Sequence, residues 1–538
     1  MTEANNPKLF TAYKVVMQTQ PDIPYSLHAY LVESTAPDNI DDIMDDSGNN
    51  TKYKYKLIPL KVDGEGCFID EIADTLDQSK NPTLVISVHG FNNPRDVILP
   101  GFWKSFECVH EDDKINNKDV VCIGYRWPSE AILSNRRNIF KSSPKLLRWL
   151  FCLGVLSLSF LIIALIFTWY EHYMGAIEHE TTIFIGIANP LVVIAVTLTF
   201  VSIPATLFLL RLSVYFRDGY RATSFGIPDL VEIIRQIDRK LDERQNRHWL
   251  SRIGRQHKRV QLSLIGHSMG GYVVTSVVRI LSDVFDPATM REGLNKQGIS
   301  AENSEKGKQA LSKIGRAFRL KRLVLVSPDI PAEALISNRA NFLSNSLARF
   351  EEAFLFSNEG DEVLRQISTI ANYFSYPTKS NKYGYRLGNI CILGLPCGIS
   401  NTFDLQNLGI GNATLGNMYD ELIKVGNKQL QDDLPRSFSY FDCTDCVEET
   451  GERWLTLAKP DLVKKMHWYD HIWLLLLYLR RRTPDVHGGY FRSPFLKKLI
   501  YRLACIGFDD SIEAYKNDKD GSLHKQCQDR QVRVLLKS

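Results

Sequence analysis

Cysteine is scarce in this chain, and so is any excess of charge of one sign. Ten cysteines among 538 residues are too few for a disulfide framework, and residues 1–6 lack the basic start and apolar run of a secretory signal. We therefore expect most thiols to be unpaired and the water-exposed parts to face a reducing compartment. The formal net charge is only +4, so charge gives no indication of nucleic-acid binding.

Residue spacing typical of metal sites is almost missing as well. Cys443-x-x-Cys446 is the one pair with metal or redox spacing, and no second CxxC or zinc-finger His pair accompanies it. We interpret these two cysteines as ordinary residues near the end of a strand. The sequence thus leads us to expect no metal and no organic cofactor.

Two long apolar runs stand out from the rest of the chain. Residues 149–170 and 183–210 carry no charge, and each is longer than the roughly 20 residues that cross a bilayer core. Basic residues flank the pair, whereas the connector 171–182 has glutamates but no Lys or Arg. The positive-inside rule then places both flanking parts on the cytoplasmic side. We expect a transmembrane hairpin over residues 149–210, the alternative being a hydrophobic lid or a dimerisation hairpin.

The remaining chain alternates short β-rich apolar runs with stretches of helical spacing. This alternation predicts an α/β fold with a mostly parallel sheet covered on both faces. The expected strands are 83–89, 119–125, 259–265, 320–326, 353–356 and 436–441, and the expected helices are 227–241 and 271–285. We expect four segments, in which 1–80 forms the first strands of the sheet, 81–148 the first part of the core, 149–210 the inserted hairpin and 211–538 the second part of the core.

A serine stands between one of these strands and the helix that follows it. Gly266-His267-Ser268-Met269-Gly270 has small residues two before and two after the serine. Strand and helix approach closely at such a turn, so only small residues fit there, and the strained serine exposes its Oγ above the sheet. The pattern predicts a nucleophile elbow with Ser268 as the nucleophile.

Attack by a serine creates an oxyanion that needs hydrogen-bond donors already in place. We expect one donor to be the backbone N–H of Met269, at the start of the following helix. The second is expected after an earlier strand, where Gly90 would let the chain turn and direct the Phe91 N–H into the site. We interpret His89 as structural.

Four motifs occur in an order that resembles a known family. Val88-His-Gly-Phe-Asn-Asn93, Arg126-Trp-Pro-Ser129, Gly266-His-Ser-Met-Gly270 and Ser327-Pro-Asp-Ile330 together look like a bacterial α/β-hydrolase family of unknown function. Tyr215-x-x-Asp218 and Ala222 resemble the segment that follows Trp-Pro-Ser directly in that family. The resemblance implies an α/β-hydrolase fold in which the hairpin is an insertion, and it does not indicate the substrate.

The acid of such a site follows the serine in the chain. Asp361 comes shortly after the strand 353–356 and after a glycine, and the resembled family also has an Asp there. We choose Asp361. The alternative acid is Asp329, which lies one strand earlier and is equally well placed to orient an imidazole.

The base must come later still. We choose His487, which lies in a turn-rich loop and resembles the His-x-x-Tyr-Phe segment near the end of the family. The alternative base is His471, whose surroundings of Trp and Tyr are more typical of packing or of a membrane interface.

These residues predict a membrane-anchored serine hydrolase that cleaves an ester or thioester through an acyl-serine intermediate. Its partners would be the lipid bilayer, through residues 149–210, and a small-molecule or lipid acyl substrate. We expect an integral protein of a bacterial inner membrane with its hydrolase domain on the cytoplasmic side. The alternatives are a non-catalytic α/β-hydrolase-fold scaffold or binding protein and a serine acyltransferase.

Overall fold

The computed structural model describes residues 10–17, 27–34, 55–64, 66–129, 145–174, 208–247, 259–285, 312–331, 346–347, 349–371, 386–389, 438–455, 469, 473, 485–516 and 521–535. Within these residues the strands are β1 (Phe10–Met17), β2 (His28–Ser34), β3 (Tyr55–Leu60), β4 (Thr83–Val88), β5 (Val120–Arg126), β6 (Val260–His267), β7 (Lys313–Ile314), β8 (Phe318–Val326), β9 (Glu352–Ser357), β10 (Ser439–Asp442) and β11 (Arg533–Leu535).

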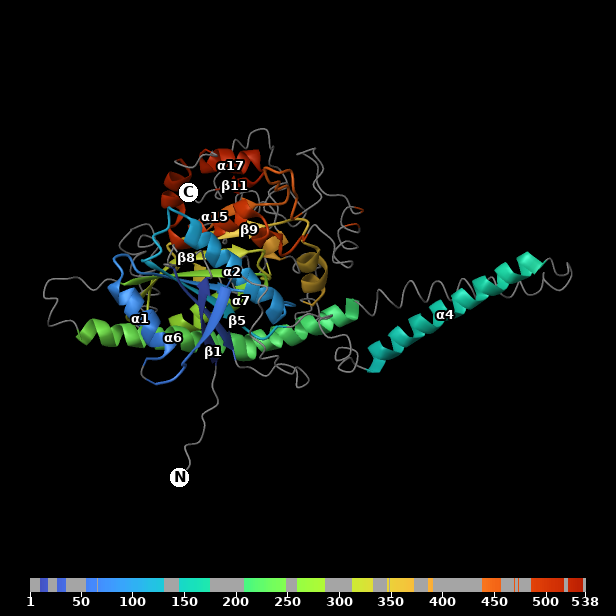
Figure 1. Cartoon of the computed structure of the whole chain (residues 1–538), viewed down its shortest axis with the longest axis horizontal. Coiled ribbons are helices and arrows are strands. Elements are labelled where there is room, and N and C mark those ends of the chain that lie inside the picture. The colour runs from blue at the N-terminus through green and yellow to red at the C-terminus, as the bar shows by residue number, and fades with distance from the viewer. Residues whose placement is uncertain are drawn as a thin grey trace, which may run out of the picture. The chain divides into compact units, whose positions relative to one another are not determined.

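These strands form one mixed sheet that is parallel over most of its width (Figure 1). Their order is β11-β10-β9-β8-β6-β4-β5-β2-β1-β3, with β7 paired to β8. All pairs from β10 to β2 are parallel, and the antiparallel pairs lie at the two edges and at β7. Every residue of β4 and β5 is buried, which explains their mostly apolar sequences, because a parallel sheet is covered on both faces.

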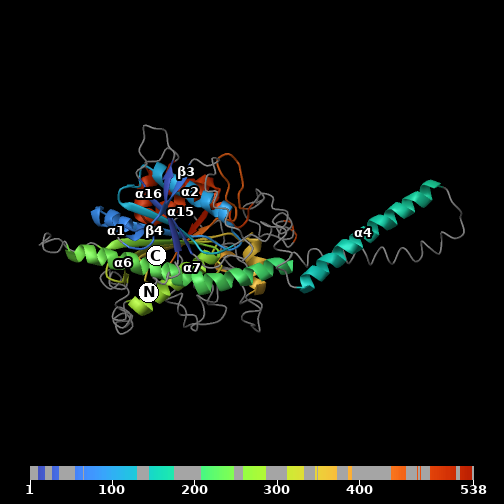
Figure 2. The same ribbon diagram turned by 60° about the horizontal axis from the view of Figure 1, so that its bottom comes forward.

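Helices cover both faces of this sheet (Figures 1 and 2). One layer consists of α1 (Phe68–Gln78), α6 (Ile227–Arg247) and α7 (Met269–Phe285), which pack side by side. The other contains α2 (Arg95–Glu111) and α15 (Pro494–Cys505), followed by α16 (Phe508–Lys516) and α17 (Leu523–Asp529). α6 packs through the stripe that its spacing predicted, with Leu230, Ile233 and Ile237 fully buried.

The expected strands and helices are present, with boundaries that differ by a few residues. The N-terminal strands join the same sheet, at its β3 edge. β2 was not among the expected strands, although it links the parallel centre of the sheet to the antiparallel β1–β3 edge. α2 and the C-terminal helices were not expected either. α2 contains Pro100, which obscures its helical pattern.

Residues 130–217 form a separate compact unit, and residues 1–129 and 218–538 form the other. The smaller unit contains α4 (Lys145–Met174), an apolar helix with exposed side chains such as Leu156 (67%) and Ile163 (64%). Among the described residues it is the one helix long and apolar enough to cross a membrane. The second expected span, 183–210, lies outside the described residues apart from its last three. One candidate helix does not establish a two-span hairpin, which stays a prediction.

Candidate active site

Ser268 occupies the turn between β6 and α7. Its φ is +55°, a left-handed conformation that costs a non-glycine residue energy. The glycines around it are sterically required: a Cβ at Gly266 would lie 2.6 Å from the Gly271 Cα, and one at Gly270 would lie 2.4 Å from the Val88 carbonyl oxygen. The strand, the helix and β4 converge so tightly that the turn exists only with these small residues.

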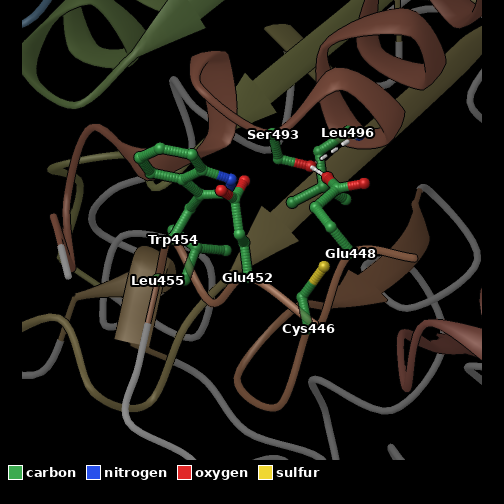
Figure 3. A pocket seen from close by; sticks show the side chains of 7 residues that line it. All are labelled: Cys446, Glu448, Glu452, Trp454, Leu455, Ser493 and Leu496. Atoms are coloured by element: carbon green, nitrogen blue, oxygen red, sulfur yellow. Dashed lines mark hydrogen bonds between the residues drawn. The ribbon is translucent and has the colours of Figure 1, made fainter. Parts of the chain in front are cut away.

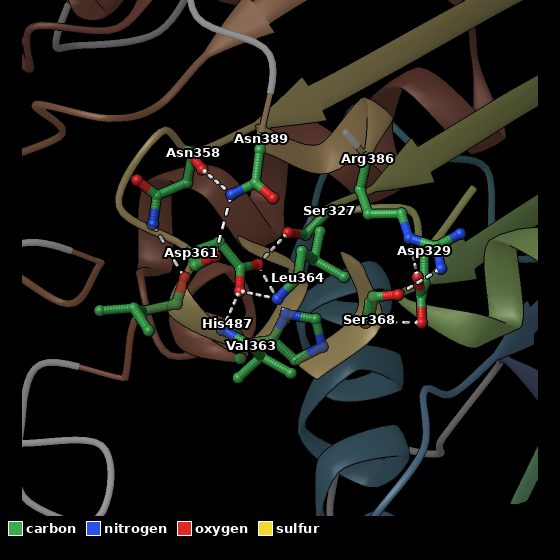
Figure 4. Close-up of polar contacts among 12 residues, drawn as sticks. Ser327, Asp329, Asn358, Asp361, Val363, Leu364, Ser368, Arg386, Asn389 and His487 are labelled. Atoms are coloured by element: carbon green, nitrogen blue, oxygen red, sulfur yellow. Dashed lines mark hydrogen bonds and ion pairs between the residues drawn. The ribbon is translucent and has the colours of Figure 1, made fainter. Parts of the chain in front are cut away.

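His487 meets Asp361 behind this turn. Its Nδ1 lies 2.6 Å from the Asp361 Oδ2 (Figure 4), and both residues are buried. The two atoms that proton transfer would join, Ser268 Oγ and His487 Nε2, are also buried, and within the described residues neither has a hydrogen-bond partner. Buried polar atoms are nearly always paired. Two such atoms, on Ser268 and on a histidine that contacts the neighbouring His267, therefore need an explanation, and a catalytic role would supply one.

The Asp361 carboxylate is held by several donors (Figure 4). Ser327 donates its hydroxyl to Oδ2, the oxygen that faces His487. The backbone N–H groups of Val363 and Leu364 donate to Oδ1 at 3.1 and 3.2 Å. These bonds leave the carboxylate little freedom to rotate, so its orientation toward the imidazole is set before any substrate binds.

Two asparagines that were not expected from the sequence hold the loop that carries Asp361, and one of them also joins it to the turn that carries His487. Asn358 donates its side-chain amide to the Val486 carbonyl at 2.8 Å, next to His487. Asn389 donates to the Asp361 carbonyl at 2.9 Å. The only sequence signal for Asn358 was its place at the end of β9, and nothing marked Asn389.

The pKa values of the two histidines near Ser268, His487 and His267, are shifted in opposite directions. Burial alone lowers the pKa of His487, but the charge and hydrogen bond of Asp361, with the more distant Asp485 and Asp329, raise that pKa above its ordinary value. Burial and the neighbouring His487 lower the pKa of His267 to about 4. His267 therefore stays neutral near pH 7, and its Nε2 contacts the His487 carbonyl oxygen at 2.9 Å.

Asp329, the alternative acid, is occupied elsewhere. Its carboxylate lies 3.1 Å from the Arg386 Nε and accepts a hydrogen bond from the Ser368 hydroxyl at 3.0 Å (Figure 4). Its backbone N–H donates to the Ser268 carbonyl at 3.0 Å. Of the two aspartates, the structure thus brings Asp361 against His487 and leaves Asp329 beside an arginine.

The loop after β4 lies beside Ser268 and forms one side of the candidate site. A Cβ at Gly90 would lie 2.6 Å from the Ser268 Cβ and 3.1 Å from its Oγ. Phe91 is buried, and its ring centroid lies 6.3 Å from that of His487. Met269 is the first residue of α7, where backbone N–H groups have no partner within the helix. Met269 thus follows Ser268 directly, and Phe91 follows Gly90, the residue in close contact with Ser268; their role as oxyanion donors stays a prediction.

His89, read as structural from the sequence, packs against Trp127. The two rings stack at 5.1 Å, and the Trp127 Nε1 donates to the His89 carbonyl at 2.9 Å. Burial and the nearby Arg126 lower the pKa of His89 to about 3. A neutral imidazole in this position serves packing and holds the start of the loop.

His471, the alternative base, lies outside the described residues. Cys443 and Cys446 are buried free thiols at the end of β10, and within the described chain no cluster of His, Cys, Asp and Glu could hold a metal. A narrow pocket with no room for a water molecule lies between residues 446–455 and the start of α15 (Figure 3). It is lined by Cys446, Glu448, Glu452, Trp454, Leu455, Ser493 and Leu496, none of which belongs to the expected catalytic set.

The fold is α/β-hydrolase-like, with a mostly parallel mixed sheet and Ser268 at the carboxyl end of a central strand. Residues 237–374 match the family described as "Alpha/beta hydrolase of unknown function (DUF900)". The match includes Ser268 and both aspartates but ends before His487, and it suggests a hydrolase-type function. No curated protein and no solved structure matches the chain significantly.

Proposed function

We propose that this protein is a serine hydrolase that cleaves an ester or thioester through an acyl-serine intermediate. Ser268 is the nucleophile, His487 the base and Asp361 the acid that orients it. The backbone N–H groups of Met269 and Phe91 hold the oxyanion. The observation that carries the proposal is the 2.6 Å contact between His487 and Asp361, together with two buried atoms, Ser268 Oγ and His487 Nε2, that have no hydrogen-bond partner among the described residues.

Each proposed role follows from the chemistry of its side chain. A serine hydroxyl is a weak nucleophile until a base takes its proton. His487 would accept that proton at Nε2 and return it to the leaving group, while its Nδ1–H stays bonded to Asp361. A water molecule, activated by the same imidazole, would then release the acyl group from Ser268.

Membrane attachment through the inserted unit is a second part of the proposal. α4 is apolar along its length, and its large side chains are exposed, as a helix surrounded by lipid would require. The basic residues that flank the two apolar runs support a cytoplasmic hydrolase domain. Attachment would keep Ser268 near the membrane and favours a lipid-derived acyl substrate.

A fluorophosphonate probe tests the nucleophile in the detergent-solubilised full chain. We expect the wild type to be labelled and Ser268→Ala to be unlabelled, because the probe phosphonylates an activated serine. Ser263→Ala is the matched control: Ser263 is another buried serine, on β6 itself, whose hydroxyl has no hydrogen-bond partner within the described part of the chain, and its loss should leave labelling unchanged. Equal labelling of wild type and Ser268→Ala, or no labelling of folded wild type, would contradict the proposal and favour the scaffold alternative.

Cysteine accessibility tests the topology. Glu178→Cys lies in the connector between the two apolar runs, and we expect an impermeant maleimide to reach it from the outer face of spheroplasts. Labelling from the cytoplasmic face alone would contradict the proposed orientation. Release of the protein from membranes by alkaline carbonate would contradict a spanning segment altogether.

A further inference from the structure

The oxyanion loop is tied to the rest of the domain at both of its ends. At its start, His89 is held by Trp127 through stacking and a hydrogen bond. At its end, the Asn92 N–H donates to the Asp218 Oδ2 at 3.0 Å and the Asn93 N–H donates to the Ser129 Oγ at 3.2 Å. Gly90, where a Cβ would lie 2.6 Å from the Ser268 Cβ, and Phe91, whose ring lies near that of His487, are between these fixed points.

Ser129 and Asp218 are themselves bonded to each other. The Ser129 hydroxyl donates to the Asp218 Oδ2 at 2.8 Å, so one carboxylate oxygen holds both the hydroxyl and the Asn92 N–H. Both side chains are completely buried. Hydrogen bonds to a buried carboxylate are strong and directional, and here they fix two consecutive backbone N–H groups of the loop.

The backbone of the loop needs this support. Asn92 has a φ of +59°, a left-handed conformation that asparagine adopts more readily than other non-glycine residues but that still costs energy. The Asp218 carboxylate accepts a hydrogen bond from the N–H of this residue. Loss of the carboxylate would remove that restraint and let the backbone around Asn92, including Phe91, change its orientation.

Ser129 and Asp218 are also the residues at which the chain leaves the core and returns to it. The inserted unit comprises residues 130–217, immediately between them. Their hydrogen bond thus joins the two core residues that flank the insertion in the sequence, and their bonds to Asn92 and Asn93 join them to the loop.

We propose that Ser129 and Asp218 form a clamp that positions the oxyanion loop, so that the insertion point and the Phe91 donor are held by one hydrogen-bond network. The two act through the backbone and are positioning residues. This inference rests on the proposed serine hydrolase function. It adds two residues, outside the Ser-His-Asp set, on which stabilisation of the oxyanion depends.

The test compares Asp218→Ala, Asp218→Asn and Ser129→Ala in the full-length protein, with fluorophosphonate inactivation as the readout. An oxyanion donor acts in the transition state more than in binding. We therefore expect Asp218→Ala to lower the maximal inactivation rate on the order of 100-fold, as misplacement of a catalytic group does, while the probe concentration for half-maximal rate stays unchanged. Ser129→Ala should lower the rate on the order of 10-fold, because the direct Asp218–Asn92 bond remains. Asp218→Asn keeps an acceptor oxygen and should restore much of the rate lost in Asp218→Ala.

Ser34→Ala is the matched control, because Ser34 donates its hydroxyl to Asp229 in a similar pair that does not touch the loop. It should leave the inactivation rate unchanged. Unchanged rates in folded Ser129→Ala and Asp218→Ala would overturn the clamp, as would a fall in rate that Asp218→Asn does not reverse. A different result, labelling that does not depend on Ser268, would contradict the proposed serine hydrolase function itself.

Discussion

The loops after β8 and β9 each carry a buried aspartate, and the two aspartates have different partners. β8 and β9 are parallel neighbours, with Val326 opposite Phe356, so Asp329 and Asp361 lie at the same edge of the sheet. Asp361 faces His487, whose charge can change near neutral pH, whereas Asp329 faces Arg386, whose charge cannot. The role open to a buried carboxylate thus depends on its partner. The Asp361–His487 pair can take part in proton transfer, whereas the Asp329–Arg386 pair can only stabilise the structure.

The largest expected effect is on turnover when Asp361 loses its charge. Asp361→Asn should lower kcat about 10⁴-fold, because an amide does not hold the imidazole in the tautomer whose Nε2 accepts a proton. Thermal unfolding of the variant should show that it is folded. A comparable loss of kcat in Asp329→Asn, measured on the same ester, would remove the distinction between the two loops.

Asp329→Asn should act mainly on stability. Its Arg386 partner is buried, with a side-chain exposure of 4%, and an uncompensated buried charge costs about 3–5 kcal/mol. Urea unfolding should show this decrease in the free energy of unfolding. In the double variant with Arg386→Gln, the loss should be smaller than the sum of the two single losses, because the same pair is broken only once. Additive losses would mean that the pair is not coupled.

Ser327 links the two loops, since it follows β8 but donates to Asp361. A hydrogen bond to a charged group contributes about 1.5 kcal/mol, so Ser327→Ala should lower kcat about tenfold. Ser327 has a φ of +43°, and Ser327→Gly would relieve that backbone while removing the same hydroxyl. The glycine variant should therefore be more stable than the alanine variant and equally slow. Wild-type turnover in both would show that Ser327 does not serve the acid.

The smallest effect concerns the pH profile. His487 must be neutral to accept a proton, so activity should rise as pH increases through its pKa, which the surrounding carboxylates raise above the usual value. Asp329 is one of the weaker contributors to that rise. Asp329→Asn removes a negative charge, lowers the pKa of His487 and should move the rising limb of kcat/KM to lower pH. A shift of the rising part of the kcat/KM profile to higher pH would contradict the conclusion that Asp329 raises the pKa of His487.

The local parts of the site were predictable from sequence, since each depends on neighbours in the chain. The turn at Ser268 is determined by the adjoining strand, helix and glycines, all within a few residues. The loop at Gly90, the proposed oxyanion loop, was located in the same way, from the strand that ends before it, and it lies beside Ser268.

The choice between Asp361 and Asp329 was not predictable from local sequence, because the partner that separates them is distant in the chain. His487 lies 126 residues beyond Asp361, and Arg386 follows a segment with no recognisable pattern. Asp218 is 126 residues from Asn92, and its role depends on where the inserted unit returns to the core. Such contacts are determined by the packing of the whole sheet.

β4 makes its two pairings on either side of the inserted unit in the sequence. It pairs with β5, which precedes the unit, and with β6, which follows it. A ribosome makes β4 and β5 first, so one edge of β4 stays open until the whole inserted unit and β6 have been synthesised. An open apolar edge is a template for pairing with other chains. The nascent protein therefore exposes this edge of β4 to misassembly until residue 267 has been made, when β6, the strand that leads into Ser268, can pair with it.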